Sequence, residues 1–266
     1  VVAPRFADDG ALEARSEVTI HEARVERART KDLSKQWRAW PQVLWALAKT
    51  SRAVQAERWL AHWWPSMLAL PLSVRVTSVL HGSDMDLLER MPSVMTRFLA
   101  RRGPVIAVAP GLASRFVRCS GGDVPHPTVC PLGAQRASEV DPVPSFANSW
   151  LRDARPKVLT VARPAVGKGL TQARNVSTST KSFAYLVVGE PLVPPHEVRA
   201  LLRHADLCVI PSRDGASLPS EGRPHIIAQA LVAGVPCVGG PNQAVRQAMR
   251  EYGQIECTGY GPDSLA

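Results

Sequence analysis

Residues 206–240 read DLCVIPSRDGASLPSEGRPHIIAQALVAGVPCVGG, and this stretch decides the fold class. It opens with a short apolar run, 206–212, that is typical of a buried strand. Pro224 suits a first helical turn, the apolar residues after it recur at helical spacing, and Gly234 is placed to end that helix. A second apolar run, 235–240, follows directly. The stretch therefore predicts a strand, a loop, a helix and a strand, as in a parallel α/β sheet.

The same alternation extends outward over the chain. Residues 196–205 show helical spacing of their apolar positions and lead straight into the strand at 206. Further β-rich apolar runs lie at 18–25, 74–82, 104–110, 157–163 and 184–190. Such alternation predicts parallel, doubly wound sheets. Residues 121–150 are rich in Pro, Gly and Ser, so we expect two domains, 1–150 and 151–266.

Composition limits the partners and the compartment. Lys and Arg total 32 against 23 Asp and Glu, a net charge of +9, which favours phosphate-bearing ligands or anionic membrane surfaces. The five cysteines are odd in number and show no metal-ligand spacing, which favours a reduced cytoplasmic compartment. No stretch has the roughly 18 uninterrupted apolar residues of a membrane span. The chain opens without Met, so we expect its natural start to lie further upstream.

Polar residues gather in the loop at 211–224, between the predicted strand and the predicted helix. In open α/β sheets, ligands bind beyond the carboxyl ends of the strands, and helix N-termini favour anions there. The loop therefore predicts a site for a phosphate-bearing ligand. A solvated loop without a ligand is the alternative that the residues alone leave open.

Two ordered motifs resemble those of the retaining GT-B glycosyltransferases, in particular glycosyltransferase family 4. Residues 206–238 are similar to its donor segment, AD-x-x-x-x-PS followed by a Glu, seven residues and a second Glu. VARPAVGKGL (161–170) resembles its VGR-x-x-x-x-KG turn. The resemblance extends through LHGSD (80–84) and implies an α/β, GT-B-like fold. Its two Rossmann-like, doubly wound domains would face a cleft, with the acceptor side first and the nucleotide-sugar side second.

The resemblance implies that Arg163 and Lys168 bind the donor diphosphate. Such a donor brings about two negative charges, and the leaving group must be stabilised as it departs. Paired cations beside a helix N-terminus can do this without a metal. An exposed structural pair is the alternative.

The remaining donor residues follow from the same motif. Glu221 would contact hydroxyls of the transferred sugar, as a catalytic residue. The backbone of Gly222, Arg223 and Pro224 would approach the sugar and the phosphates. Gln229 stands where the family has its second Glu, which binds the ribose, and an amide can hydrogen-bond a diol without a charge-assisted bond.

His81 resembles the family's catalytic histidine, which hydrogen-bonds the sugar or the acceptor; a structural histidine is the alternative. The nearby pair Asp84 and Asp86 has the Asp-x-Asp pattern that binds divalent cations in glycosyltransferases of another fold. We expect no metal site, because this pair lies in the acceptor-side half.

Residues 34–64 combine six tryptophans with Lys and Arg, which suits a membrane interface, although ordinary helices packed on the first sheet explain them too.

The resemblance thus implies a retaining, metal-independent hexosyltransferase that needs no cofactor. The donor would be a UDP- or GDP-sugar and the acceptor a glycan or a lipid-linked molecule, in the cytoplasm or peripherally on the cytoplasmic membrane face. Nucleic-acid binding has no supporting motif. Two alternatives stay open: a degenerate, non-catalytic nucleotide-sugar binder, and a peripheral membrane scaffold. Both are compatible with Gln229 and with the short length of this chain. Compared with the family, this chain has only a short polar stretch at 171–183 and lacks the C-terminal helices.

Overall fold

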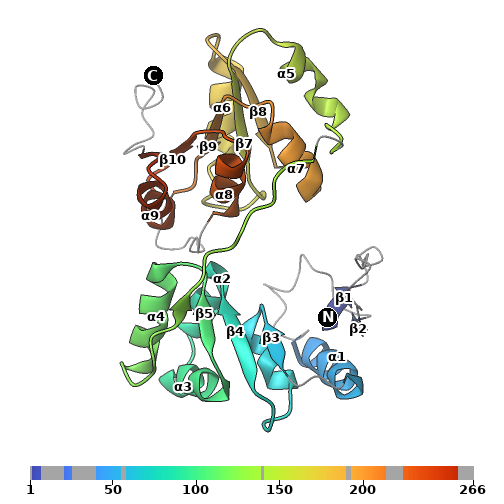
Figure 1. The fold of residues 1–266 in the computed structure, drawn as a ribbon, viewed down its shortest axis with the longest axis vertical. Coiled ribbons are helices and arrows are strands. Elements are labelled where there is room, and N and C mark those ends of the chain that lie inside the picture. Colours follow the sequence, from blue (N-terminus) through green and yellow to red (C-terminus); the bar gives the residue numbers. More distant parts are fainter. Residues whose placement is uncertain are drawn as a thin grey trace. The chain divides into compact units, whose positions relative to one another are not determined.

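The computed structural model describes residues 2–6, 21–25, 40–54, 58–138, 141–189, 193–213 and 224–256. The chain forms two compact units, Val1–Val129 and Cys130–Ala266 (Figure 1). This division lies within the Pro-, Gly- and Ser-rich stretch 121–150, some twenty residues before its end. The reason is that η4 (Ser145–Ala147) and α5 (Asn148–Arg152) contribute Ala147 and Trp150 to the core of the second unit.

The second unit is built on a parallel sheet with the strand order β11-β10-β9-β7-β8. Its helices connect successive strands, and the predicted strands at 157–163, 184–190, 206–212 and 235–240 are confirmed. The strands are β7 (Lys157–Val161), β8 (Ala184–Val188), β9 (Leu207–Ile210), β10 (Cys237–Gly239) and β11 (Ile255–Glu256). The helices are α6 (Leu170–Ser179), α7 (Pro195–Leu202), α8 (His225–Val232) and α9 (Gln243–Glu251).

The strand order of this sheet reverses between β7 and β9. From β7 the chain moves outward to β8, then returns to β9 on the other side of β7 and continues to β10 and β11. Right-handed crossovers then place α6 on one face of the sheet and α7, α8 and α9 on the other, which is a doubly wound arrangement. The loops after β7 and β9 diverge, so the carboxyl ends of these two strands form the switch point at which such sheets bind ligands.

The expectation that residues 171–183 form only a short polar stretch is wrong, because most of them belong to helix α6. Ser and Thr compete with helix formation, and the hydroxyls of Ser177 and Thr178 bond to carbonyls three residues back. The helix forms nevertheless, because Leu170 and Ala173 are buried beneath it. Tertiary packing thus overrides a weak local preference.

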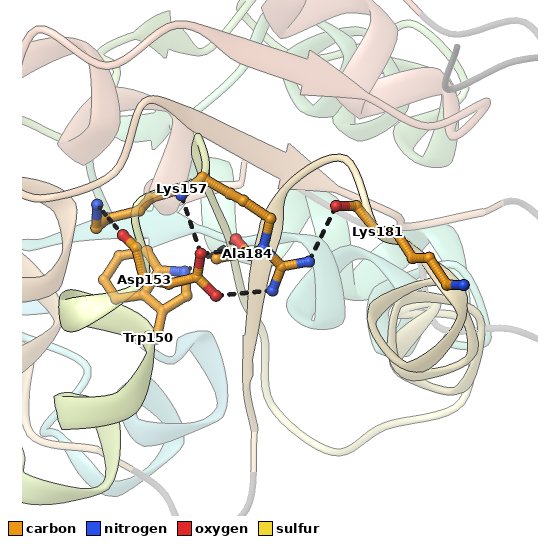
Figure 2. A network of polar contacts seen from close by, with 6 residues as sticks. Trp150, Asp153, Lys157, Lys181 and Ala184 are labelled. Carbon is orange, nitrogen blue, oxygen red and sulfur yellow. Dashed lines mark hydrogen bonds and ion pairs between the residues drawn. The ribbon is translucent and has the colours of Figure 1, made fainter.

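A polar network fastens the segment before β7 to the amino end of the sheet (Figure 2). The Trp150 indole Nε1 donates to the Ala184 carbonyl at 3.0 Å. The Asp153 carboxylate accepts from the Arg155 guanidinium at 2.7 Å, and Lys157 Nζ donates to the Asp153 carbonyl at 3.0 Å. These contacts lie at the edge opposite to the switch point and serve the structure rather than a ligand.

The first unit has a parallel sheet with the strand order β3-β4-β5-β6. The predicted strands at 74–82 and 104–110 are confirmed, whereas β3 and β6 are too short to give a sequence signal. The strands are β3 (Trp59–Ala61), β4 (Val76–Leu80), β5 (Val105–Ala107) and β6 (Thr128–Val129). The connections are η3 (Trp64–Ala69), α2 (Gly82–Leu88), α3 (Ser93–Arg102) and α4 (Pro110–Ser120).

The beginning of the first unit is a separate pair of parallel strands, β1 (Val2–Phe6) and β2 (His21–Val25), the second within the predicted run 18–25. Helix α1 (Trp40–Ala53) lies beside both strands. The core of the unit is large and apolar, with Trp64, Met67, Leu80, Leu99 and Phe116 fully buried. Within the described residues, no helix is both long enough and apolar enough to cross a membrane.

Candidate functional site

The turns after β7 and β9 are held together at the switch point of the second sheet. Gly169, at the end of the first turn, has a φ of 70°, and a Cβ there would overlap the Pro211 carbonyl. The Arg213 amide donates to the Gly167 carbonyl at 2.9 Å. Only glycine permits this close approach without strain. The 162–169 turn and the 211–213 segment therefore act as one support.

This support carries three cations. Arg163 and Lys168 lie in the 162–169 turn, where the Lys168 amide closes a tight turn onto the Ala165 carbonyl at 3.2 Å. Arg213 extends from the neighbouring segment, and its side chain is exposed, like that of Arg163. Neither segment contains Asp or Glu. The support is therefore positively charged at the edge where a parallel sheet binds ligands.

A third turn, after β10, joins the same edge. The Gly240 amide donates to the Ile210 carbonyl at 2.7 Å, and the Asn242 amide donates to the Ser212 carbonyl at 3.3 Å. The Asn242 side chain caps α9 by accepting from the amides of Ala244 and Val245, both at 3.1 Å. These contacts fix the backbone of the 211–213 segment from the side opposite to Gly167.

Helix α8 begins beside this edge, as the sequence predicts. Pro224 is its buried N-cap and has no N–H. The first backbone N–H groups that could bind a ligand at this helix start therefore belong to His225 and Ile226. The His225 ring nitrogen Nε2 hydrogen-bonds the Gly133 carbonyl at 2.8 Å, which ties the helix start to the segment that enters the second unit. Gln229 lies one turn further along and is half-buried.

The structure describes four of the predicted donor-binding residues. Arg163, Lys168, Pro224 and Gln229 all belong to the second unit and lie in the switch-point turn or in α8. The predicted residues Glu221, Gly222 and Arg223 lie outside the described residues. Arg213 belongs to the polar loop 211–224 that the sequence indicates as a ligand site, but its position beside the 162–169 turn depends on strand order rather than on local sequence.

His81 lies in the first unit, at the carboxyl end of β4, and it is the N-cap of α2. Its amide donates to Asp84 Oδ2 at 3.1 Å, and the Trp64 indole donates to the Asp84 carbonyl at 3.1 Å. Burial, and secondarily the neighbouring His62, lower the pKa of His81 below its ordinary value. The imidazole is therefore neutral at physiological pH and can accept a hydrogen bond.

The Asp-x-Asp pair in α2 has separate partners. Asp84 is buried and accepts from the His81 amide, whereas Asp86 accepts from Arg115 Nη2 of α4 at 2.9 Å. Residues two apart on a helix do not face each other. No cluster of three or more His, Cys, Asp or Glu that could hold a metal is found in the part of the chain that the structure describes. The pair therefore serves the capping and bracing of α2.

Asp84 gives a testable pH dependence. Burial raises the pKa of Asp84 from 3.8 to about 6. At a pH between these two values, the Asp84 carboxyl is protonated in the folded state and ionised in the unfolded state. Stability contributed by this group therefore falls as the pH rises from about 4 to about 6, by up to about 3 kcal/mol at about 1.4 kcal/mol per pKa unit. Asp84→Asn keeps the acceptor for the His81 amide and removes this loss.

Urea unfolding of both proteins from about pH 4 to about pH 7 covers this window and measures the effect. We expect the stability of the parent relative to Asp84→Asn to decrease through this window. Equal differences at all pH values would show that the Asp84 carboxyl titrates normally.

No protein-family model matches the chain, and no curated protein sequence matches it. Solved structures do resemble it. HepE of Anabaena, in complex with UDP and glucose, superposes with a TM-score of 0.56 at 13% identity, over 86% of this chain and 69% of that one. A UDP-forming α,α-trehalose-phosphate synthase of Burkholderia vietnamiensis gives 0.59 at 12% identity, over 90% and 70%. WaaG, a glycosyltransferase of lipopolysaccharide biosynthesis, gives 0.57 at 9% identity, over 95% and 76%.

These similarities establish the fold. The chain has the two-unit, parallel α/β architecture of these GT-B glycosyltransferases, which confirms the predicted fold class. At such low sequence identity the similarity shows the fold alone, and the function has to be argued from the site.

Proposed function

We propose that this protein is a retaining glycosyltransferase, similar to family 4, that transfers a hexose from a UDP- or GDP-sugar to a glycan or lipid-linked acceptor without a metal. The observation that carries the proposal is the support formed by the 162–169 turn and the 211–213 segment. It presents Arg163, Lys168 and Arg213 at the switch point, beside the start of α8. The complexes of HepE with UDP and with UDP-glucose support this choice of ligand class.

The proposed reaction breaks the bond between the anomeric carbon and the phosphate oxygen of the donor. The bonding electrons leave with the nucleotide diphosphate, and the acceptor hydroxyl oxygen bonds to the anomeric carbon from the same face. The hydroxyl proton passes to the departing phosphate oxygen. Arg163 and Lys168 stabilise the negative charge that develops on the diphosphate, and Arg213 adds a third cation at the same edge.

The other predicted residues have binding roles in this scheme. The neutral imidazole of His81 accepts a hydrogen bond from a sugar or acceptor hydroxyl, and Glu221 contacts hydroxyls of the transferred sugar. The backbone at Gly222 and Arg223 approaches the phosphates together with the first amides after Pro224. The Gln229 amide hydrogen-bonds the ribose hydroxyls.

The assay for this proposal is sugar transfer by the purified chain from UDP- and GDP-sugars, with and without EDTA. Transfer that persists in EDTA, with the anomeric configuration of the donor retained in the product, supports the scheme. Donor binding without any product, over a panel of glycan and lipid-linked acceptors, would instead support the degenerate, non-catalytic binder.

A second proposal concerns a membrane surface on the first unit, which we call the α1–η3 surface. Its exposed apolar side chains are Trp45 of α1, Leu60 of β3 and Leu72 after η3, which are 67%, 56% and 76% exposed. Lys49 lies over the Trp45 ring, with Nζ 5.5 Å from the ring centroid. Residues 40–54 and 58–83 contain no Asp or Glu, and their cations include the exposed Arg52, Arg58 and Arg75.

Exposed Trp and Leu beside Lys and Arg suit the interface of an anionic bilayer. We therefore place the transferase in the cytoplasm, at the inner membrane face, where lipid-linked acceptors are found. The same surface would serve the scaffold alternative, so membrane binding alone does not distinguish the two. The sugar-transfer assay does.

Vesicle cosedimentation tests the α1–η3 surface. We expect binding to vesicles that contain phosphatidylglycerol, weaker binding at high salt, and little binding to pure phosphatidylcholine. The double variants Trp45→Ser with Leu72→Ser, and Lys49→Gln with Arg52→Gln, should each release the protein from the vesicles. Val94→Ser, which removes an exposed apolar side chain from α3, is the matched control and should bind like the parent. Equal binding by all four proteins would contradict the assignment.

A further inference from the structure

Two histidines meet at the carboxyl edge of the first sheet. His62 directly follows β3 and His81 directly follows β4, and these neighbouring strands are parallel. Their rings are stacked, with centroids 5.9 Å apart and planes inclined by 23°. Because the carboxyl ends of parallel strands meet at one edge, the pairing follows from strand order and has no local sequence pattern.

The two rings differ in their contact with solvent. His62 is exposed, whereas His81 is half-buried. Water therefore reaches the His62 ring more freely than the His81 ring. A proton on His81 faces burial first and, second, repulsion from a charge on the neighbouring His62 ring. The pair accordingly favours a neutral His81.

The other groups around His81 do not supply a competing positive charge. On α2, Asp84 receives the His81 amide. On η3, the neighbouring side chain is the uncharged indole of Trp64. The charges on the outer face of α2, Asp86 and Glu89, are paired with Arg115 of α4. Strand β5 consists of Val, Ile and Ala only. Among the described residues, His62 is thus the basic side chain that stacks on His81.

We propose that His62 is a positioning residue for His81: its ring covers one face of the His81 imidazole, fixes the plane of that imidazole and opposes a positive charge on it. His81 is then held as a hydrogen-bond acceptor for a hydroxyl group. The choice of a hydroxyl group as the partner of His81 rests on the proposed function. The coupling of the two rings is independent of that function.

Histidine-labelled protein, titrated by NMR, measures the coupling directly. His81→Gln assigns the His81 signals. The two test variants are His62→Phe, which keeps a ring beside His81 and removes the charge, and His62→Gln, which removes both. We expect the titration midpoint of His81 to rise toward the ordinary histidine value in both variants, because the neighbouring charge is gone. A His81 midpoint that stays at the parent value in both variants would overturn the proposal.

The pH profile of sugar transfer adds a functional readout. In the parent, the acid limb of kcat should lie at a lower pH than in His62→Phe, with KM for the donor unchanged. His62→Gln should also lower kcat at neutral pH, because the ring that holds the His81 plane is missing. If no transfer is found at all, the proposed function fails, whereas the NMR titration still decides the coupling. An unshifted acid limb in an active enzyme would overturn the role of His62.

Discussion

Replacing Arg163 or Lys168 by alanine is expected to lower kcat/KM for the donor by a factor on the order of 10²–10³, because each removes a charge that stabilises the leaving diphosphate. Both residues lie in the 162–169 turn, where Arg163 is exposed and Lys168 is half-buried. Steady-state transfer assays measure the loss, and urea unfolding checks that the second unit stays intact.

The matched control for this experiment is Arg174→Ala. Arg174 is an exposed cation on α6 of the same unit, so its removal changes the net charge equally without touching the switch point. We expect it to transfer sugar like the parent. If Arg163→Ala and Lys168→Ala do so as well, the diphosphate does not bind at this turn.

Gly169→Ala should both destabilise the second unit and weaken donor binding. The added Cβ overlaps the Pro211 carbonyl, and the φ of 70° is unfavourable for alanine. Left-handed strain of about 1–2 kcal/mol and overpacking of about 1–3 kcal/mol together predict a loss of about 2–5 kcal/mol. Relief of the overlap would part the 162–169 turn from the 211–213 segment and so separate the cations.

Gly234→Ala separates the effect of backbone strain from the effect of the overlap with Pro211. Gly234 also has a positive φ, 77°, but a Cβ there has no heavy atom within 4 Å. This variant should show only the backbone strain, about 1–2 kcal/mol, and should bind the donor normally. Urea unfolding and calorimetric titration with UDP compare the pair. Equal losses of stability, with equal affinity for UDP, would mean that the approach of Gly169 to Pro211 is unimportant.

The strands and helices of the second half could be predicted because local signals agree there. The apolar runs, Pro224 at the helix start and Gly234 at its end all favour the same strand-loop-helix-strand unit, which the structure contains as β9, α8 and β10. By contrast, α6 has a polar, Ser/Thr-rich sequence and depends on packing at Leu170 and Ala173. The boundary of the second unit likewise depends on Trp150, whose indole bonds across to Ala184.

The site shows the same division between local and long-range information. The spacing of Arg163 and Lys168 within one turn is visible in the sequence, and so is the position of His81 after a strand. Neither the hydrogen bond from Arg213 to Gly167 nor the stack of His62 on His81 has a local pattern. Both arise because parallel strands that are distant in sequence end at one edge of a sheet.

The most direct test of the donor site is a thermal-shift measurement of the purified chain against UDP- and GDP-sugars, with and without EDTA. The Arg163→Ala, Lys168→Ala double variant is measured in parallel. A ligand that binds only the folded state raises Tm, so we predict a rise for the parent with one of the two nucleotides that EDTA leaves unchanged. The double variant should show no such rise. An unchanged Tm for the parent with every donor would contradict a nucleotide-sugar site in the second unit.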